Sequence, residues 1–273
     1  MSVKNPSDNE AKARQEARKS STESGSSVGP VTSAIVSAAG LGARLGTLTR
    51  ECPKALVAVN GEPLLPRLAK QLSQAGVKNL TVVLGYRGDQ IRDALGTNAG
   101  GMQVSYVHAA NYASTNNIAS LAVAPCPTAP VAISDCDVFL SRLPHDWLRE
   151  TGSDIVIPTR ALARDEAGTV LRMQNGRWRL KVLRQPSEAR AGDRKTISLY
   201  LLFSSDLIKI FFREIGRTVA NRETSLYYED VLSGVLRDTY TIADVAIEDQ
   251  GIAAFEIDRP IDLQAAEQWA ANA

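Results

Sequence analysis

The sequence predicts an α/β fold in which a mostly parallel, mixed sheet lies between two layers of helices. From Thr32 onward, short apolar runs typical of buried strands alternate with stretches of helical spacing. Polar or glycine-rich segments follow these runs directly, as they do where parallel strands end at a ligand site. Alternating strands and helices predict parallel pairing because each crossover returns the chain to the same edge of the sheet.

The first half of the chain supplies four strands and their helices. The run from Val31 to Ala38 ends at glycines and is typical of a buried parallel strand. A helix is expected from Pro63 to Gly76, where leucines recur at helical spacing before a glycine stop. The elements that follow are a strand over residues 80–84, a helix over 89–95, a strand over 104–107, a helix over 117–124 and a strand over 131–134.

The second half is less regular. We expect strands over residues 155–158, 178–183, 197–203 and 253–257, and helices over 205–215, 227–237 and 261–271. Residues 32–273 are therefore predicted to form one continuous domain, with a substrate-facing subregion at about residues 154–240. Residues 1–31 are polar, mixed in charge and rich in serine. They predict a disordered tail, because such a segment cannot bury enough surface to offset its ordering entropy.

The composition excludes several classes of protein. Hydrophobic residues make up 44% of the 273-residue chain and charged residues 22%, values typical of a globular protein in water. The net charge of +1 gives no indication of nucleic-acid binding. No apolar run approaches the roughly 18 residues of a membrane helix, so no membrane insertion is expected. The three cysteines lack metal-ligand spacing and favour a reducing, cytoplasmic location. Assembly into a homo-oligomer stays open.

Three glycines and two cations follow the first strand. Gly40, Gly42 and Gly46 are spaced GxGxxxG, without the Lys-Ser/Thr pair of a P-loop. A dinucleotide-binding fold needs GxGxxG and an acid at the end of the second strand, which ends here in Gly85 and Tyr86. Arg44 and Lys54 add two fixed positive charges, which suit a triphosphate better than a neutral ligand.

This loop resembles the opening motif of the nucleotidyltransferase family, roughly AAGxGxRLxxLTxxxPKxL. The matching segment here is AAGLGARLGTLTRECPKAL. NYASTNNIASL, ISDCDVFL and FEIDRPIDL resemble further segments of cytidylyltransferases that activate phosphocholine or aminoalkylphosphonates. The resemblance covers about residues 32–273. It implies a Rossmann-like three-layer sandwich of the nucleotide-diphospho-sugar transferase type.

The resemblance also implies the chemistry of the site. Asp137 and Asp258 are expected to hold Mg²⁺, a hard cation that prefers carboxylate oxygens, although each is also a common type of strand-end cap. Asp135 is either a neighbour of that site or a structural residue. Arg44 and Lys54 are expected to bind the phosphates. The candidates for holding CTP are Ala39, Gly40, Gly42, Gly85, Tyr86, Asn117 and Ser120, with a helix-cap role as the alternative for Asn116 and Asn117.

Acceptor recognition is expected in the segment LYYED, residues 226–230. Tyr228, Glu229 and Asp230 would surround an ammonium or trimethylammonium group through cation–π and charge contacts. The same residues also fit one apolar face and the acidic start of a helix. Lys181 and Arg184 are candidates for neutralising the acceptor phosphate, with a solvated strand face as the alternative.

The sequence therefore predicts an Mg²⁺-dependent cytidylyltransferase. Its substrates would be CTP and a small phosphorylated or phosphonate acceptor, with release of pyrophosphate. A sugar-1-phosphate nucleotidyltransferase using UTP, dTTP or CTP is the alternative within the enzyme class. A catalytically silent nucleotide-binding regulatory module is the alternative outside it.

Overall fold

The computed structural model describes residues 29–128, 130–149 and 152–273. Most of the predicted tail, residues 1–28, lies outside these ranges. The helices are α2 (Leu64–Gln74), α3 (Gly88–Leu95), α4 (Asn117–Ala122), α5 (Ser205–Ala220), α6 (Tyr228–Leu236) and α7 (Pro260–Asn272). The 3-10 helices are η1 (Ala43–Thr49), η2 (Lys54–Leu56), η3 (His145–Leu148), η4 (Pro186–Glu188) and η5 (Glu248–Gln250). The strands are β1 (Ser33–Ala38), β2 (Ala58–Val59), β3 (Glu62–Pro63), β4 (Asn79–Leu84), β5 (Asn98–Ala99), β6 (Met102–His108), β7 (Val131–Asp135), β8 (Val138–Leu140), β9 (Ile155–Ala161), β10 (Gly168–Gln174), β11 (Arg177–Leu183), β12 (Arg194–Thr196), β13 (Leu199–Leu202), β14 (Ile242–Ala246) and β15 (Ala254–Glu256).

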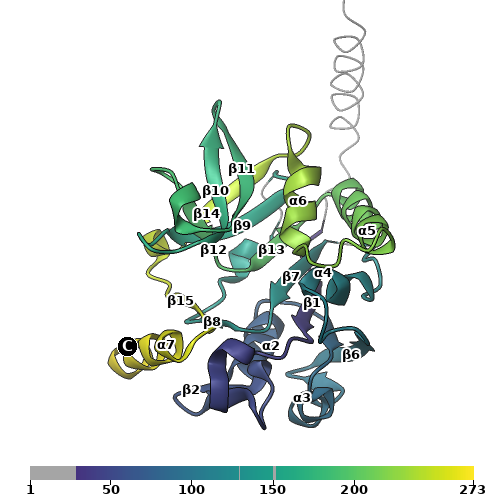
Figure 1. Ribbon diagram of the computed structural model, residues 1–273, viewed down its shortest axis with the longest axis vertical. Coiled ribbons are helices and arrows are strands. Elements are labelled where there is room, and N and C mark those ends of the chain that lie inside the picture. The colour runs from purple at the N-terminus through teal and green to yellow at the C-terminus, as the bar shows by residue number, and fades with distance from the viewer. Residues whose placement is uncertain (1–28, 129, 150–151) are drawn as a thin grey trace, which may run out of the picture.

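The main sheet has the order β11-β10-β12-β9-β13-β7-β1-β4-β6-β5, and β14 pairs with β9 (Figure 1). Strands β7, β1, β4 and β6 pair in parallel. Antiparallel pairs through β13 extend the sheet to the β10–β11 hairpin. The chain builds outward from β1 to β4 and β6, then returns to the other side of β1 with β7, and ligands bind at such a reversal. The predicted α/β fold with a mixed sheet is confirmed.

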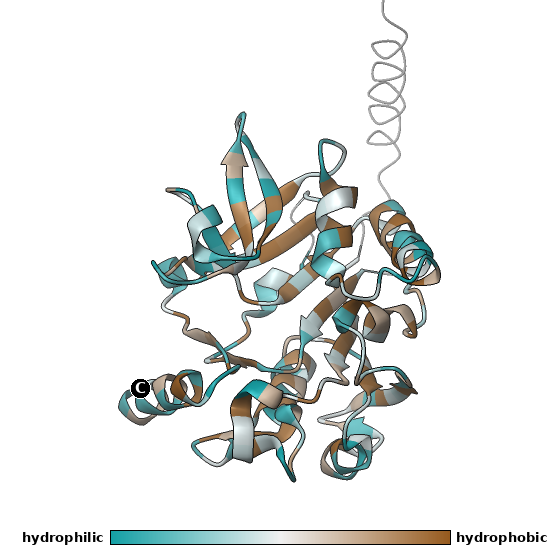
Figure 2. Ribbon diagram, viewed as in Figure 1, coloured by the Kyte–Doolittle hydropathy of each residue, from teal (hydrophilic) through white to brown (hydrophobic). Residues whose placement is uncertain are grey.

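Side chains of the central strands alternate between two hydrophobic layers, one on each face of the sheet. On β4, Leu80, Val82 and Leu84 belong to the layer that packs with α2 and α3. Val83 belongs to the layer that packs with α4, α5 and α6. The helices are banded in brown and teal in Figure 2, as expected for elements that bury one face. Burial of both sheet faces explains why the central strands are apolar runs in the sequence.

A third core attaches the C-terminal helix beside the loop that follows β1. It contains the buried residues Leu45, Val57, Val59, Leu64, Phe139, Ile257 and Ala266. Strand β15 pairs antiparallel with β8, and the Ile257 amide donates to the Asp137 carbonyl oxygen at 2.9 Å. In Figure 1, α7 accordingly lies on the same side as β2 and far from the β10–β11 hairpin. This pairing brings Asp258 beside Asp137.

Three strands of the second half, β10, β12 and β14, are absent from the sequence prediction. They lie in the outer, largely antiparallel part of the sheet, where polar and apolar residues mix and no continuous apolar run forms. Asn175 and Gly176 join β10 to β11 with φ values of 50° and 73°. An Asn-Gly pair is the usual signal of a two-residue hairpin, so the β10–β11 turn is readable from the sequence.

Gly85, directly after β4, packs too closely on its neighbours to carry a side chain. A Cβ atom there would lie 2.5 Å from the Ala39 carbonyl oxygen and 2.7 Å from Cγ of Tyr112. We expect Gly85→Ala to lower the free energy of unfolding by about 3 kcal/mol, the upper end for overpacking. Chemical denaturation followed by circular dichroism measures this change.

Gly216 in α5 provides the matched control for that substitution. A Cβ atom there meets no heavy atom within 4 Å. Gly216→Ala should therefore raise the free energy of unfolding by about 0.5–1 kcal/mol, because alanine loses less backbone entropy in a helix. Equal effects of the two substitutions would show that close packing is not what requires Gly85.

Candidate active site

A cleft of about 1350 Å³ opens beyond the carboxyl ends of β1 and β7. The loop after β1, the start of α4 and residues 135–137 line one part of it. Strands of the antiparallel half, the start of α6 and residues around Asp258 line the rest. Single-ligand pockets are usually of the order of 300–1000 Å³, so this cleft has room for two substrates side by side.

Gly42 shapes the loop that lines the cleft after β1. Its φ of 64° is left-handed, a conformation that costs glycine little. The Gly42 carbonyl oxygen accepts a hydrogen bond from the Thr49 hydroxyl at 2.9 Å. A Cβ atom on Gly42 would lie only 3.0 Å from Cβ of Lys54. The glycine therefore lets the loop turn tightly against Lys54.

Lys54 lies between two carboxylates. Its Nζ donates to the Asp137 carboxylate and, at 2.5 Å, to Oδ1 of Asp258. Nη2 of Arg44 lies 2.8 Å from the same Asp258 oxygen. Burial alone would lower the pKa of Lys54, but attraction to the two carboxylates outweighs it and holds that pKa above its usual range. The structure thus brings the four predicted phosphate and metal residues to one point.

The predicted nucleotide-binding residues fall into two groups. Gly40, Gly42, Asn117 and Ser120 line the cleft, and Ala39, Gly85 and Tyr86 do not. The Tyr86 amide donates to the Ala39 carbonyl oxygen at 3.0 Å. The Tyr86 hydroxyl is 2.7 Å from the Arg50 carbonyl oxygen, on the outer side of the loop. These three residues therefore support the loop from behind rather than face the cleft.

Asn116 and Asn117 connect α4 to the segment before α6. The Asn116 amide donates to the Thr224 carbonyl oxygen at 2.8 Å. Oδ1 of Asn117 accepts from the Tyr228 amide at 3.1 Å, and Nδ2 donates to Oε2 of Glu229 at 3.3 Å. The Asn117 side chain thus helps to place α6 and also lines the cleft, where contact with cytosine or ribose stays a prediction.

Tyr227 lines the cleft, whereas the predicted Tyr228 does not. Tyr228 is fully buried and packs edge-on against Tyr200, with 5.9 Å between ring centroids. With Leu232 and Leu236 it forms the apolar face of α6, which the sequence allowed as the alternative. Glu229 is next along the helix and does line the cleft, as predicted.

Asp230 also lies outside the cleft. It binds Arg184, a residue that does line the cleft. Both carboxylate oxygens of Asp230 are 2.7 Å from Nη2 of Arg184, and one accepts from the Tyr227 amide at 2.8 Å. The Arg184 guanidinium lies 5.1 Å from the centre of the Tyr227 ring. Asp230 therefore caps α6 and positions Arg184, in place of the direct acceptor contact expected for it.

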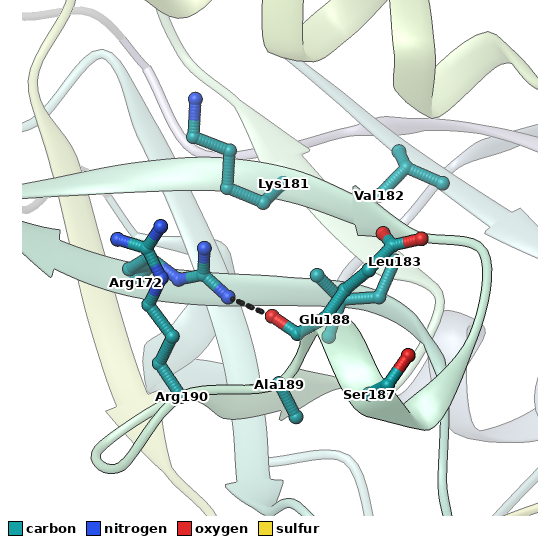
Figure 3. A pocket seen from close by; sticks show the side chains of 8 residues that line it. All are labelled: Arg172, Lys181, Val182, Leu183, Ser187, Glu188, Ala189 and Arg190. Carbon is teal, nitrogen blue, oxygen red and sulfur yellow. Dashed lines mark hydrogen bonds between the residues drawn. The ribbon is translucent and has the colours of Figure 1, made fainter.

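Lys181 lies in a separate pocket beside the β10–β11 hairpin (Figure 3). This pocket has a volume of about 420 Å³ and also contains Arg172 and Arg190. The dashed line in Figure 3 marks the hydrogen bond of 2.9 Å from Arg172 to the Glu188 carbonyl oxygen. Of the two predicted acceptor cations, only Arg184 lines the central cleft.

Sequence reasoning missed an ion pair in the cleft, Lys195 with Glu256. The Lys195 side chain is only 4% exposed, and its Nζ lies 2.5 Å from Oε2 of Glu256. The Ser198 hydroxyl donates to the other Glu256 oxygen. Glu256 belongs to the FEIDRPIDL segment, so the family resemblance could have identified it as a site residue. Lys195 lies in the short polar strand β12, and no sequence pattern singles it out.

Glu229 is a buried carboxylate of the cleft with a raised pKa. Burial raises its pKa from 4.5 to about 7. Hydrogen bonds from its own backbone amide and from Asn117 oppose this rise, as does the positive charge of Lys195, while the charge of Glu256 adds to it. Asp135 faces the same region, and burial followed by the charge of Glu229 raises the pKa of Asp135.

The raised pKa of Glu229 predicts a pH-dependent stability. The pKa of Glu229 is higher in the folded protein than in the unfolded chain, so the protonated side chain stabilises the fold. This contribution to the free energy of unfolding is fully present below about pH 4.5 and is lost as the pH rises through about 7. We expect Glu229→Gln to gain thermal midpoint relative to the wild type as the pH rises from about 5 to about 8. Thermal unfolding followed by circular dichroism at several pH values measures the difference.

Glu166→Gln is the control of opposite sign. Although burial alone would raise the pKa of Glu166, its ion pair with Arg160 lowers that pKa. Its ionisation therefore adds stability that is lost as the pH falls, so Glu166→Gln should lose thermal midpoint relative to the wild type as the pH rises. A flat difference for Glu229→Gln would show that the carboxylate is not held in a buried site.

The chain is similar in sequence to known proteins. Residues 34–204 match the model of the MobA-like NTP transferase domain. The chain is 30% identical over 254 residues to CMP-5'-(3-aminopropyl)phosphonate synthase of Streptomyces rubellomurinus, covering 86% of this chain and 38% of that protein. It is 36% identical over 120 residues to choline-phosphate cytidylyltransferase of Streptococcus pneumoniae, covering 43% of this chain and 51% of that protein. The chain thus matches only part of the length of these relatives.

The fold comparison agrees with the sequence match. The solved structure of CTP:phosphocholine cytidylyltransferase from Streptococcus pneumoniae has a TM-score of 0.71 to this chain at 20% identity, over 88% of this chain and 99% of that one. At this identity the likeness shows the fold. Since the family model spans more than half of the sequence, the chain belongs to the family of MobA-like NTP transferase domains.

Proposed function

We propose that this chain is a cytidylyltransferase, which transfers CMP from CTP to a phosphate or phosphonate acceptor that carries a cationic amine. One observation carries the proposal. The same cleft contains two cations suited to a polyphosphate, Arg44 and Lys54, and a buried carboxylate suited to an amine, Glu229. The names of the two relatives, which concern CMP transfer to an aminoalkylphosphonate and to choline phosphate, support this choice of substrates.

Asp137 and Asp258 suit Mg²⁺. Their carboxylates converge on one cation, the Lys54 ammonium, so they are placed to share a positive ion. Mg²⁺ is commonly held by one or two carboxylates together with substrate phosphates and water. The described residues contain no group of three or more His, Cys, Asp or Glu side chains arranged around one metal position, so the triphosphate would complete the coordination. When bound, the metal supplies neutralisation of phosphate charge and polarisation of the α-phosphoryl group.

The residues of the cleft would then act mainly by binding and orientation. An acceptor oxygen attacks the α-phosphorus of CTP, a new P–O bond forms, and the bond from the α-phosphorus to the oxygen bridging to the β-phosphorus breaks as pyrophosphate leaves. The acceptor oxygen is already an anion near neutral pH, so no general base is needed. His108 and His145, the two histidines of the chain, do not line the cleft. Arg44 and Lys54 would stabilise the phosphates, and Arg184 would neutralise the acceptor's phosphorus group.

Pyrophosphate release tests the proposal. With Mg²⁺ present, CTP, UTP, dTTP, ATP and GTP are each combined with phosphocholine, 2-aminoethylphosphonate, phosphoethanolamine and several sugar 1-phosphates. We expect turnover with CTP and an amine-bearing acceptor only, and loss of turnover when EDTA removes the metal. Turnover with a sugar 1-phosphate in place of the amines would contradict the proposed acceptor. Nucleotide binding without turnover in any combination would favour a silent nucleotide-binding module.

A further inference from the structure

We infer that the acceptor carries a primary ammonium group and that a trimethylammonium acceptor is disfavoured. The inference rests on the proposed function and narrows its acceptor from cationic amines in general to those with N–H donors. The cleft offers two carboxylates without a cationic partner where the amine would bind and lacks a set of free aromatic faces around them.

Two carboxylates in the cleft lack a positive partner. Glu229 is 5% exposed and lines the cleft, and its carboxylate accepts hydrogen bonds from its own backbone amide and from Nδ2 of Asn117, the latter at 3.3 Å, but forms no ion pair with the described residues. The Asp135 carboxylate also lines the cleft and makes no hydrogen bond or ion pair with the described residues. Carboxylates in such surroundings are normally paired with a cation, and neither of these two has one among the described residues.

Lys195, whose positive charge acts on Glu229, already has other partners. Lys195 donates to Glu256 at 2.5 Å and to the Thr196 carbonyl oxygen at 3.2 Å. Glu229 and Asp135 line the same cleft. A primary ammonium has three N–H donors and would satisfy both carboxylates at once. A trimethylammonium group has none, and it would take water away from both carboxylates without replacing its hydrogen bonds.

The aromatic residues around the cleft argue in the same direction. A quaternary ammonium is typically held by several aromatic faces. Among the described residues, the aromatic side chains that line the cleft are Tyr112, Tyr227 and Phe255. Arg184 already lies over the Tyr227 ring, and Phe255 packs against Phe139 with 6.1 Å between ring centroids. The tyrosine that would have extended an aromatic surface beside Glu229, Tyr228, is buried in the core.

A matched pair of acceptors tests the inference with the unmodified protein. Phosphoethanolamine and phosphocholine differ only in the methyl groups on nitrogen. With CTP and Mg²⁺, we expect kcat/KM to be at least about tenfold higher for phosphoethanolamine, because hydrogen bonds between charged groups are lost with phosphocholine. The same preference should hold for 2-aminoethylphosphonate over its N,N,N-trimethyl derivative. Equal or higher kcat/KM for the trimethylated acceptors would overturn the inference and leave the proposed function standing. Absence of turnover with all four acceptors would overturn the proposed function and the inference with it.

Substitution of Glu229 and Asp135 tests whether these two carboxylates cause the preference for primary ammonium acceptors. Glu229→Gln and Asp135→Asn should each move the ratio of kcat/KM between the primary and trimethylated acceptors toward one, with the KM for CTP within about twofold of wild type. Retained turnover of phosphocholine shows that each variant is folded. Asp165→Asn, at an exposed position of the same cleft, is the control and should keep the wild-type ratio. An unchanged ratio in Glu229→Gln and Asp135→Asn would contradict the assignment.

Discussion

Asp137→Asn is expected to reduce turnover by roughly 10³-fold or more. The amide keeps the shape of the side chain but removes the charge that faces Lys54 and, by the proposed function, Mg²⁺. In the free protein Lys54 keeps its second partner, Asp258, at 2.5 Å, so the fold should survive the substitution. Pyrophosphate release at saturating CTP and acceptor measures turnover, and circular dichroism checks the fold.

Asp146→Asn is the matched control for this experiment. Asp146 is 80% exposed on η3 and lies outside the residues that line the cleft. Its substitution should leave turnover within about twofold of the wild type, as is usual for an exposed position. If Asp137→Asn also stayed within this range, Asp137 would have no role in metal or phosphate binding.

Lys54→Met is expected to have the second large effect. Turnover should fall by roughly 10²–10³-fold, because the variant lacks a fixed cation beside the phosphates. The same variant should bind Mn²⁺ more tightly than the wild type when no nucleotide is present, since the Lys54 ammonium lies between the two proposed metal carboxylates. Titration of Mn²⁺ followed by electron paramagnetic resonance measures this binding directly.

Two further variants make the Mn²⁺ titration decisive. Lys209→Met, at an exposed position of α5, should leave Mn²⁺ binding unchanged. The double variant Lys54→Met with Asp137→Asn should lose the gain, because one carboxylate of the pair is gone. If Lys54→Met bound Mn²⁺ no better than the wild type, the two carboxylates would not be the metal ligands.

Residues at the ends of parallel strands were the most predictable part of the site. Arg44 and Asp137 follow apolar runs that are readable as strands, and parallel strands place their carboxyl ends at one edge of the sheet. Lys54 was assigned from its place in the AAGLGARLGTLTRECPKAL motif. Asp258 joined them through the family resemblance, and the pairing of β15 with β8 explains its position. The position of these strand-end residues was thus readable from the sequence, whereas the metal role of Asp137 and Asp258 came from the family resemblance.

Residues whose role depends on rotation about an element were less predictable. The segment LYYED correctly predicted a helix. The rotation of α6 about its own axis, however, determines that Tyr228 enters the core while Tyr227 and Glu229 line the cleft. A one-residue error moves a side chain by about 100° around a helix, and packing against Tyr200 sets this angle. In the same way, Lys181 was grouped with Arg184 although the two residues lie at different pockets.

Lys195 shows what sequence patterns cannot supply. It comes from a strand of three polar residues, and only long-range pairing of β12 with β9 and β10 places it beside Glu256. The distant contact, rather than any local signal, makes this lysine a buried part of the cleft. Lys195 is thereby paired with Glu256 rather than with Glu229.

The central claim is that the α-phosphorus of CTP becomes bonded to an oxygen of an amine-bearing acceptor. Phosphorus NMR of a mixture of the protein, CTP, Mg²⁺ and 2-aminoethylphosphonate tests it most directly. We predict a coupled pair of resonances, one from the CMP phosphorus and one from the phosphonate phosphorus, together with an equal amount of pyrophosphate. Pyrophosphate with CMP but no coupled pair would show hydrolysis of CTP instead, and a coupled product formed only with a sugar 1-phosphate would contradict the proposed acceptor.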